Sequence, residues 1–266
     1  GSKNFTEQLI LGEIVAQHVE ARLGVAVERR LNLGGTLLAH QALVSGAIDL
    51  YPEYTGTGLL TVLKLPVMSD PGEVFKTVAD AYLAQFDLVW LDPAPMNNTQ
   101  ALAMTRARAA ELGIVTISDM AARAGELVMV GPTEFQERED GLPGIRAAYG
   151  DFELKEYKAV DPGLRYQALS DGQADVTVAF GTDGEIAAFD LVLLVDDKGL
   201  FPPYQVAPVV RKAALDANPE IADLLNQVSP LLTDAVMQEL NYEVSGNKRE
   251  PAEVAKQFLT EQGLLK

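Results

Sequence analysis

The segment QALVSGAIDLYPEYTGT (residues 41–57) reads as the end of a helix, a turn and an apolar strand that runs into a Thr-Gly-Thr loop. It aligns without a gap on QALSDGQADVTVAFGTD (residues 167–183), so that residue 41 falls on residue 167. Both copies begin with Gln-Ala-Leu, and three further pairs coincide: Gly46 with Gly172, Asp49 with Asp175, and Tyr54 with Phe180. The sequence therefore predicts two similar α/β lobes.

Each copy ends its strand with an aromatic residue. Ligands of open α/β sheets bind at the carboxyl ends of the strands. We therefore expect Tyr54 and Phe180 on opposite walls of one cleft. The alternative is that these are two unrelated helix–turn–strand units, which any α/β protein contains.

Helices and short apolar strands alternate along the rest of the chain, which is typical of α/β proteins with parallel pairing. Thr6 is a candidate N-cap and Gly24 a candidate stop for the first helix. Further helices are expected from near Thr36, over 71–86, and from about Pro219 to Leu265. Strands are expected at 25–33, 47–52, 87–93 and 154–160, with Trp90 and Tyr51 as core residues.

The composition excludes several classes of function. The chain has 266 residues, 48% of them hydrophobic, and a formal net charge of −17. That charge argues against nucleic acid and anionic membrane surfaces as partners. There is no cysteine, which removes disulfides, thiolate catalysis and cysteine-based zinc sites. No apolar run approaches the ~18 residues of a membrane span.

A catalytic constellation is not evident. His18 and His40 lie in predicted helices without metal-ligand spacing, and no G-x-S-x-G, P-loop or G-x-G-x-x-G motif occurs. The acidic pairs Glu139-Asp140 and Asp196-Asp197 are typical of solvated turns. The loops after the predicted strands instead supply rings, amides, hydroxyls and Arg138. We therefore expect a binding protein that is not an enzyme and has no metal or cofactor.

A series of motifs carries a resemblance over essentially the whole chain. In order they are GSKNFTEQLILGEI, LGGT, SGAIDLYPEYTGT, NNTQALAM, EREDGLPG, AFGTDGEI and DDKGLFPPYQVAPVVR. They resemble the substrate-binding proteins of ABC importers for glycine betaine, choline and carnitine. The resemblance implies a two-lobed type II periplasmic-binding-protein fold, with a ligand cleft between lobes joined by two hinge crossings. Lobe one would comprise residues 1–104 plus 206–266, and lobe two residues 105–205.

The resemblance also implies site residues. Family members hold a quaternary ammonium in a box of aromatic rings, because ring faces attract a cation that cannot donate N–H hydrogen bonds. Carried over by position, the box comprises Tyr54, Gln100, Phe180 and Tyr204. The carboxylate clamp comprises Lys3, Thr57 and Arg138, and Asn98 is a further ligand-binding residue.

Two positions depart from the family's tyrosine-rich box. Gln100 replaces a ring outright, and Phe180 keeps the ring without a hydroxyl. Losing one ring costs about 1 kcal/mol or more, roughly five- to tenfold in affinity. The departure predicts either weak binding of glycine betaine or a different, amino-acid-like or larger zwitterion that hydrogen-bonds to Gln100.

The predicted partners are a small solute and a membrane ABC permease, and the predicted state is a monomer. We expect a periplasmic protein, or an extracytoplasmic one anchored through a segment outside this sequence, which starts at Gly1-Ser2 like a mature or trimmed chain. Two alternatives from other classes are an enzyme related to porphobilinogen deaminase and the effector domain of a regulator. The enzyme would need a cysteine, which this chain lacks, and the effector domain would need an attached DNA-binding motif.

Thr6, Glu7 and Gln8 either only start a helix or also contact the ligand.

Overall fold

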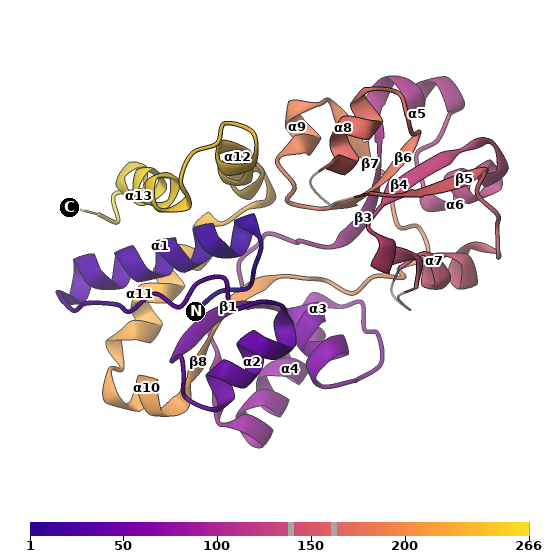
Figure 1. Ribbon diagram of the computed structural model, residues 1–266. Coiled ribbons are helices and arrows are strands. Elements are labelled where there is room, and N and C mark those ends of the chain that lie inside the picture. The colour runs from indigo at the N-terminus through magenta and orange to yellow at the C-terminus, as the bar shows by residue number, and fades with distance from the viewer. Residues whose placement is uncertain (138–140, 161–163, 266) are drawn as a thin grey trace. The chain divides into compact units, whose positions relative to one another are not determined.

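The computed structural model describes residues 1–137, 141–160 and 164–265, which fold into two compact units (Figure 1). Unit 1 comprises Gly1–Asn98 and Pro203–Lys266, and unit 2 comprises Thr99–Pro202. Both combine helices with a sheet, so the predicted α/β class is confirmed. The lobe boundaries expected from the sequence, between residues 104 and 105 and between 205 and 206, stay a prediction, and so do the two hinge crossings.

Unit 1 contains a three-stranded sheet and most of the long helices. Its strands are β1 (Leu50–Tyr54), β2 (Leu88–Trp90) and β8 (Val206–Arg211). Its helices are α1 (Thr6–Leu23), α2 (Thr36–Val44), α3 (Thr55–Thr57), the π-helical turn η1 (Gly58–Val62), α4 (Pro71–Phe86), α10 (Lys212–Ala217), α11 (Glu220–Val228), η5 (Ser229–Leu231), α12 (Asp234–Ser245) and α13 (Pro251–Glu261).

The sheet of unit 1 has the order β1-β8-β2, and both pairings are antiparallel. The parallel pairing expected from the sequence is therefore wrong for this sheet. The reason is that β8 comes from the distant C-terminal segment and runs back between the two early strands. A long-range partner of this kind leaves no local sequence signal.

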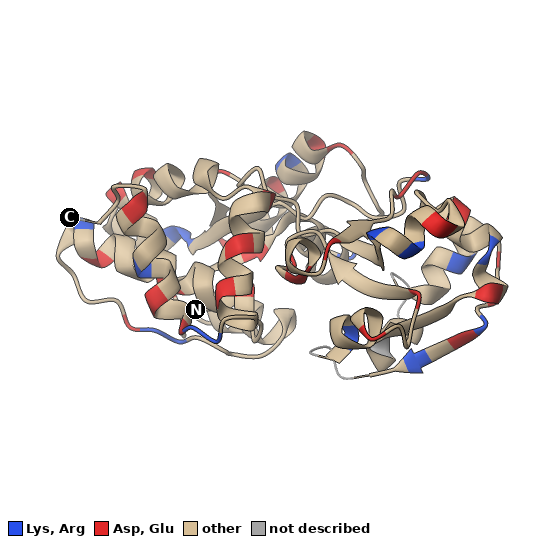
Figure 2. Ribbon diagram, turned by 90° about the horizontal axis from the view of Figure 1, so that it is seen from above, with Lys and Arg blue, Asp and Glu red and all other residues tan. Residues whose placement is uncertain are grey.

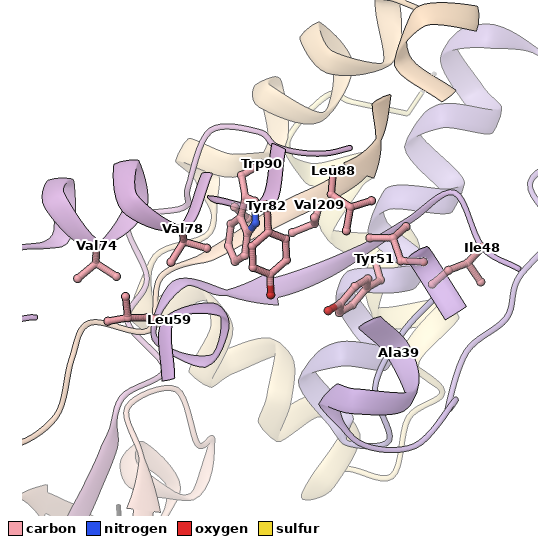
Figure 3. Packing of buried hydrophobic residues seen from close by; sticks show 12 residues of the cluster. Ala39, Ile48, Tyr51, Leu59, Val74, Val78, Tyr82, Leu88, Trp90 and Val209 are labelled. Carbon is pink, nitrogen blue, oxygen red and sulfur yellow. The ribbon is translucent and has the colours of Figure 1, made fainter. Parts of the chain in front are cut away.

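Alternate side chains of these strands enter two different cores, because successive residues of a strand point to opposite faces. On one face Tyr51, Trp90 and Val209 pack with α2 and α4 (Figure 3). On the other face Val210 packs with residues of α1 and α11. Tyr51 is fully buried and Trp90 nearly so, which confirms the prediction that both are core residues.

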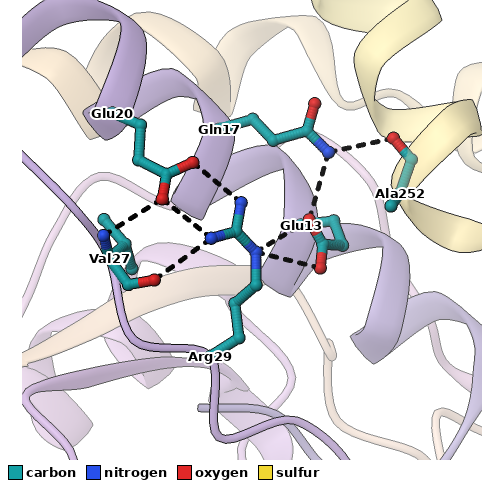
Figure 4. Close-up of polar contacts among 6 residues, drawn as sticks. All are labelled: Glu13, Gln17, Glu20, Val27, Arg29 and Ala252. Atoms are coloured by element: carbon teal, nitrogen blue, oxygen red, sulfur yellow. Dashed lines mark hydrogen bonds and ion pairs between the residues drawn. The ribbon is translucent and has the colours of Figure 1, made fainter. Parts of the chain in front are cut away.

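Residues 25–33 form no strand, so that prediction is wrong. Figure 4 shows why the segment lies along α1. Arg29 donates to both oxygens of Glu20 at 2.8 Å and to Glu13 at 3.1 Å, and the Val27 N–H donates to Glu20 at 3.0 Å. The Arg29 hydrogen bond lowers the pKa of Glu20 to about 2. The segment alternates apolar and polar residues because it packs on a helix and not because it joins a sheet: Val27 contributes to the core that contains Val15 and Val19 of α1.

Unit 2 contains a mixed five-stranded sheet of order β5-β4-β6-β3-β7. Its strands are β3 (Gln100–Thr105), β4 (Val128–Gly131), β5 (Glu156–Ala159), β6 (Val176–Phe180) and β7 (Leu191–Leu193). Its helices are α5 (Arg106–Leu112), α6 (Ile117–Ala122), η2 (Ala124–Glu126), η3 (Thr133–Gln136), α7 (Leu142–Tyr149), α8 (Arg165–Ser170) and α9 (Glu185–Ala188). Here parallel pairing is present, between β4 and both β5 and β6, whereas β3 pairs antiparallel with β6 and β7.

The predicted helix ends agree closely with the structure. Helix α1 begins at Thr6, with Phe5 rather than Thr6 as the N-cap, and ends at Gly24 in the left-handed conformation. Helix α4 spans the predicted 71–86, capped by the Asp70 side chain. Acidic residues outnumber basic ones, 38 to 21, and Figure 2 shows them spread over helices of both units. Within the described ranges, every helix is too short or too polar to cross a bilayer.

Candidate ligand-binding site

Tyr54 ends β1 in unit 1, and its side chain is held on several sides. The ring is 3% exposed. Its hydroxyl donates to Glu7 Oε1 at 2.6 Å, and Lys3 Nζ lies 4.7 Å from the ring centroid. Phe5 stacks on it at 6.2 Å between centroids. Burial and the neighbouring Glu7 carboxylate raise the pKa of Tyr54 well above its usual value, so the phenol stays a neutral donor.

The cation over this ring belongs to a buried ion pair. Lys3 Nζ lies 2.5 Å from Glu53 Oε1, and both side chains are almost fully buried. The same carboxylate accepts the Tyr54 N–H at 2.7 Å and the Tyr51 hydroxyl at 2.9 Å. A buried charge pair is tolerated when further hydrogen bonds satisfy it. Glu53 therefore fixes both the end of β1 and the position of Lys3.

The Thr-Gly-Thr turn after Tyr54 contacts the segment that begins at Pro203. Thr55 Oγ1 donates to the Pro203 carbonyl at 3.0 Å and accepts from the Gln205 N–H at 3.1 Å. At Gly56 an added Cβ would lie 2.8 Å from two ring carbons of Tyr204. The glycine therefore allows the Tyr204 ring to pack against the backbone, while Thr55 clamps the chain on either side of it.

Tyr204 is held from the other side by the segment before the unit boundary. The Tyr204 N–H donates to Asn97 Oδ1 at 2.7 Å, and the Asn98 N–H donates to the Tyr204 carbonyl at 3.1 Å. The Asn98 side chain in turn donates to Glu7 Oε1 at 2.9 Å. Tyr204, Asn98 and Tyr54 thus belong to one connected hydrogen-bonded region of unit 1.

In unit 2, Gln100 and Phe180 are directly opposite partners in the β3–β6 register. Gln100 is buried, 7% exposed, and Phe180 is half-buried at the end of β6. The Phe180 N–H donates to Asp183 Oδ2 at 2.9 Å. Sheet pairing therefore brings these two predicted box residues together.

Asp183 also pairs with a buried arginine. Arg165 Nη2 lies 2.7 Å from Asp183 Oδ2, and the Tyr166 hydroxyl donates to the same oxygen. The Arg165 guanidinium lies 4.4 Å from the Tyr166 ring centroid and 5.8 Å from that of Phe180. Burial lowers the pKa of Arg165, but Asp183 and Tyr166 raise it more, so the net shift is upward. Arg165 is thus a fixed cation beside the Phe180 ring.

The predicted residues fall into two groups. Unit 1 holds five of them, within or beside the region around Glu7 and Glu53: Lys3, Tyr54, Thr57, Asn98 and Tyr204. Unit 2 holds Gln100 and Phe180. Arg138 and the Glu139-Asp140 pair lie outside the described residues. The ligand contacts of all eight predicted residues stay a prediction.

Sequence reasoning missed the charged residues that support the rings. No sequence pattern marks Glu53, Arg165 or Asp183, although Glu53 lies within the repeat segment 41–57. From the sequence, Glu7 is expected only to start a helix or to contact the ligand near the helix N-terminus. An acid next to an aromatic residue is too common to be a signal by itself. In the part of the chain that the structure describes, no group of three or more acids or histidines is placed to hold a metal ion.

Comparison with known proteins gives matches along the whole chain. Residues 1–261 match the family described as the substrate binding domain of ABC-type glycine betaine transport systems. A glycine-betaine-binding protein of Pseudomonas aeruginosa is 39% identical over 275 residues, covering 100% of this chain and 88% of that protein. An ergothioneine transport permease/binding protein of Helicobacter pylori is 36% identical over 99% of this chain, which spans only 47% of its length.

Solved structures agree with the family match. The crystal structure of a glycine betaine/carnitine/choline ABC transporter superposes with a TM-score of 0.90 at 30% identity, covering 100% of this chain and 98% of that one. The lactococcal OpuAC protein, closed on glycine betaine, has a TM-score of 0.65 at 17% identity over 98% and 94% of the two chains, and supports the fold alone. The type II periplasmic-binding-protein fold is thereby confirmed. The chain belongs to the family of substrate-binding domains of ABC-type glycine betaine transport systems.

Proposed function

We propose that this protein captures a quaternary-ammonium zwitterion of the glycine betaine type outside the cytoplasm and delivers it to an ABC permease. The observation that carries the proposal is Tyr54, a buried ring at a strand end with the Lys3 ammonium 4.7 Å from its centroid. A zwitterion needs both groups, a ring face for its cation and a cation for its carboxylate.

In this proposal the cationic head contacts the rings of Tyr54, Phe180 and Tyr204, with Gln100 and Asn98 beside them. The carboxylate is bound by Lys3, Thr57 and Arg138. Because the proposed residues come from both units, we expect ligand binding to favour a closed state. Relatives named for glycine betaine support the choice of solute.

Titration calorimetry with glycine betaine, proline betaine, choline, carnitine and ergothioneine tests the proposal. We expect heat with at least one of them. Tyr204→Ala should lose about five- to tenfold in affinity or more, because a ring contact is worth about 1 kcal/mol. Tyr204→Phe keeps the ring and is the matched control, expected to stay near the parent. No heat with any ligand would reject the quaternary-ammonium proposal.

A second candidate ligand is a larger or amino-acid-like zwitterion that hydrogen-bonds to Gln100. The buried position of Gln100 opposite Phe180 favours it, and one relative is named for ergothioneine. Gln100→Tyr separates the two candidates. Tighter betaine binding indicates a box that lacks a ring, whereas unchanged betaine binding favours the larger ligand.

A further inference from the structure

Glu7 joins three separate parts of unit 1 through one buried carboxylate. It lies in the first turn of α1 and is 3% exposed. Its Oε1 accepts from the Tyr54 hydroxyl at 2.6 Å and from Asn98 Nδ2 at 2.9 Å, and its Oε2 accepts from Asn241 Nδ2 at 2.9 Å. The donors come from β1, from the segment before the unit boundary and from α12. A single side chain therefore sets the relative position of all three.

The contact with Tyr54 determines how that ring is presented. A hydrogen bond to an ionised acceptor is about twice as strong as a neutral one. The Tyr54 hydroxyl is the far end of the ring, so holding it at Glu7 restricts rotation of the whole side chain. The backbone end of the same residue is held by Glu53, which accepts its N–H at 2.7 Å. Tyr54 is thus fixed at both ends by carboxylates.

The hydrogen bond between Glu7 and Asn98 determines which polar atom of the Asn98 amide remains available to a ligand. Nδ2 donates to Glu7, whereas Oδ1 is buried and has no hydrogen-bond partner among the described residues. A buried acceptor without a partner costs free energy unless a ligand or water satisfies it. An amide oxygen carries partial negative charge, which suits a cationic head group. Glu7 therefore selects the oxygen, and not the NH₂ group, as the free end of this amide.

We propose that Glu7 is a positioning residue of the ligand site, which holds the Tyr54 ring and the Asn98 amide in one arrangement before the solute binds; this rests on the proposed function. Glu7 acts through these two side chains and not by direct contact with the ligand. The same arrangement gives an otherwise ordinary helix-starting acid a role in affinity.

The first experiment needs no ligand. In NMR spectra of the free protein, the Tyr54 hydroxyl proton should be slowly exchanging and shifted downfield, and the Asn98 side-chain NH₂ resonances should be shifted as well. Glu7→Ala should abolish the hydroxyl signal and move the amide resonances. Glu7→Gln keeps an oxygen acceptor and should retain a weaker form of the hydroxyl signal. Unchanged spectra in Glu7→Ala would refute the positioning role.

The second experiment measures affinity for glycine betaine by calorimetry. We expect at least a tenfold loss in Glu7→Ala and a loss within threefold in Glu7→Gln. Glu13→Ala is the matched control, because it removes another buried carboxylate of α1 whose partners are Arg29 and Gln17. That variant should keep its affinity within twofold.

A double-mutant cycle shows whether Glu7 acts through Tyr54. The variant that combines Glu7→Ala with Tyr54→Phe should bind no more weakly than Glu7→Ala alone. Additive losses, or parent-like affinity in Glu7→Ala, would overturn the inference. If Glu7→Ala does not fold, Glu7→Gln with Tyr54→Phe gives the same cycle. If the parent binds no betaine, the proposed function fails, while the NMR spectra still decide whether Glu7 positions the two side chains.

Discussion

The ends of β1 and β6 each hold an aromatic residue with a carboxylate and a cation, but different residues supply these groups. At each, a carboxylate accepts the N–H of the terminal aromatic residue, at 2.7 Å for Tyr54 and 2.9 Å for Phe180. Each carboxylate pairs with a buried cation that lies beside the ring, and each accepts a tyrosine hydroxyl. The carboxylates are Glu53 and Asp183, which do not align with one another in the repeat.

The turns that precede these strands match position by position. Gly46 and Gly172 are both left-handed, with φ of 76° and 69°. Asp49 and Asp175 each pair with an arginine, at 3.1 and 2.8 Å. The two regions are therefore equivalent up to the strand and differ after it. The same arrangement of ring, carboxylate and cation is therefore present at both strand ends, although residues at different positions of the repeat supply it.

The largest difference between the two ends should be in stability. Glu53→Ala leaves Lys3 as an unpaired buried charge, which costs about 3–5 kcal/mol. The Arg165–Asp183 pair is more exposed, with the Asp183 side chain at 22% against 0% for Glu53. Asp183→Ala should therefore cost less, about 1–3 kcal/mol. Urea unfolding curves measure both, and equal losses would show that the two ends are energetically alike.

The next prediction asks whether Lys3 serves the ligand or only its own ion pair. The double variant Lys3→Met/Glu53→Gln removes both charges of the pair at once. If Lys3 binds the ligand carboxylate, a charge-assisted hydrogen bond worth about 1.5–3 kcal/mol is lost for glycine betaine, roughly ten- to a hundredfold in affinity.

Choline is the control ligand, since it has the cationic head but no carboxylate. Its affinity should change by less than about threefold. Parallel losses for both ligands would mean that the pair only supports the Tyr54 ring. The corresponding pair of unit 2 can be tested in the same way with Arg165→Met/Asp183→Asn.

The aligned positions two residues after Tyr54 and Phe180 differ in the space available for a side chain. Gly56 has Tyr204 against its backbone, whereas the aligned position of unit 2 is Thr182, which carries a side chain. A methyl group at position 56 would lie 2.8 Å from the Tyr204 ring and 2.9 Å from the Pro203 carbonyl. Gly56→Ala should therefore cost about 1–3 kcal/mol by overpacking and weaken ligand binding through Tyr204.

Thermal unfolding and betaine calorimetry measure the two effects of Gly56→Ala. Thr182→Ala is the control and removes atoms instead of adding them. An unchanged affinity in Gly56→Ala would show that the position of the Tyr204 ring does not matter for binding.

The sequence predicts the parts of the fold that local patterns encode. Helical spacing located α1, α2 and α4, and the internal repeat located β1 and β6. The strand predicted at 25–33 is absent. The apolar side chain of Val27 packs against α1, and Arg29 holds the segment there. The predicted parallel pairing is wrong in unit 1, because β8 arrives from far along the chain and pairs antiparallel with both β1 and β2.

For the candidate site, the resemblance supplied the rings but not their supports. Tyr54 and Phe180 stand out because the repeat places an aromatic residue at the end of both strands. Glu7 and Asp183 do not stand out, because acids are frequent at helix starts and in turns, and Glu53 is a single acid within β1. Their roles depend on side chains brought together from distant segments, such as Asn241 beside Glu7. Only the folded structure shows these contacts.

The smallest expected effect is a difference in acid sensitivity between the two units. The chain has only two histidines, His18 and His40, and both lie in unit 1. Burial lowers the pKa of each; at His18 the nearby Arg22 lowers it further, with a smaller opposing effect from the Leu224 and Leu264 backbone. By hydrogen-bond geometry, both His18 ring nitrogens lack a partner in the described part of the chain. The folded state therefore favours neutral rings.

The sign follows from proton linkage. In the unfolded chain a histidine titrates near pH 6.5. Below that pH the unfolded state binds more protons than the folded one, so the stability that the neutral rings provide above pH 6.5 is lost as the pH falls through their folded pKa values. Trp90 lies in the core of unit 1, so its fluorescence follows the unfolding of that unit. Its urea midpoint should fall between pH 7.5 and 5.5, and His18→Leu should reduce the fall. The protection factors for hydrogen exchange in β4 and β6, which compare each amide with its intrinsic exchange rate at the same pH, should change less over this interval, because unit 2 has no histidine. A parallel change in both units would assign the effect to carboxylates instead.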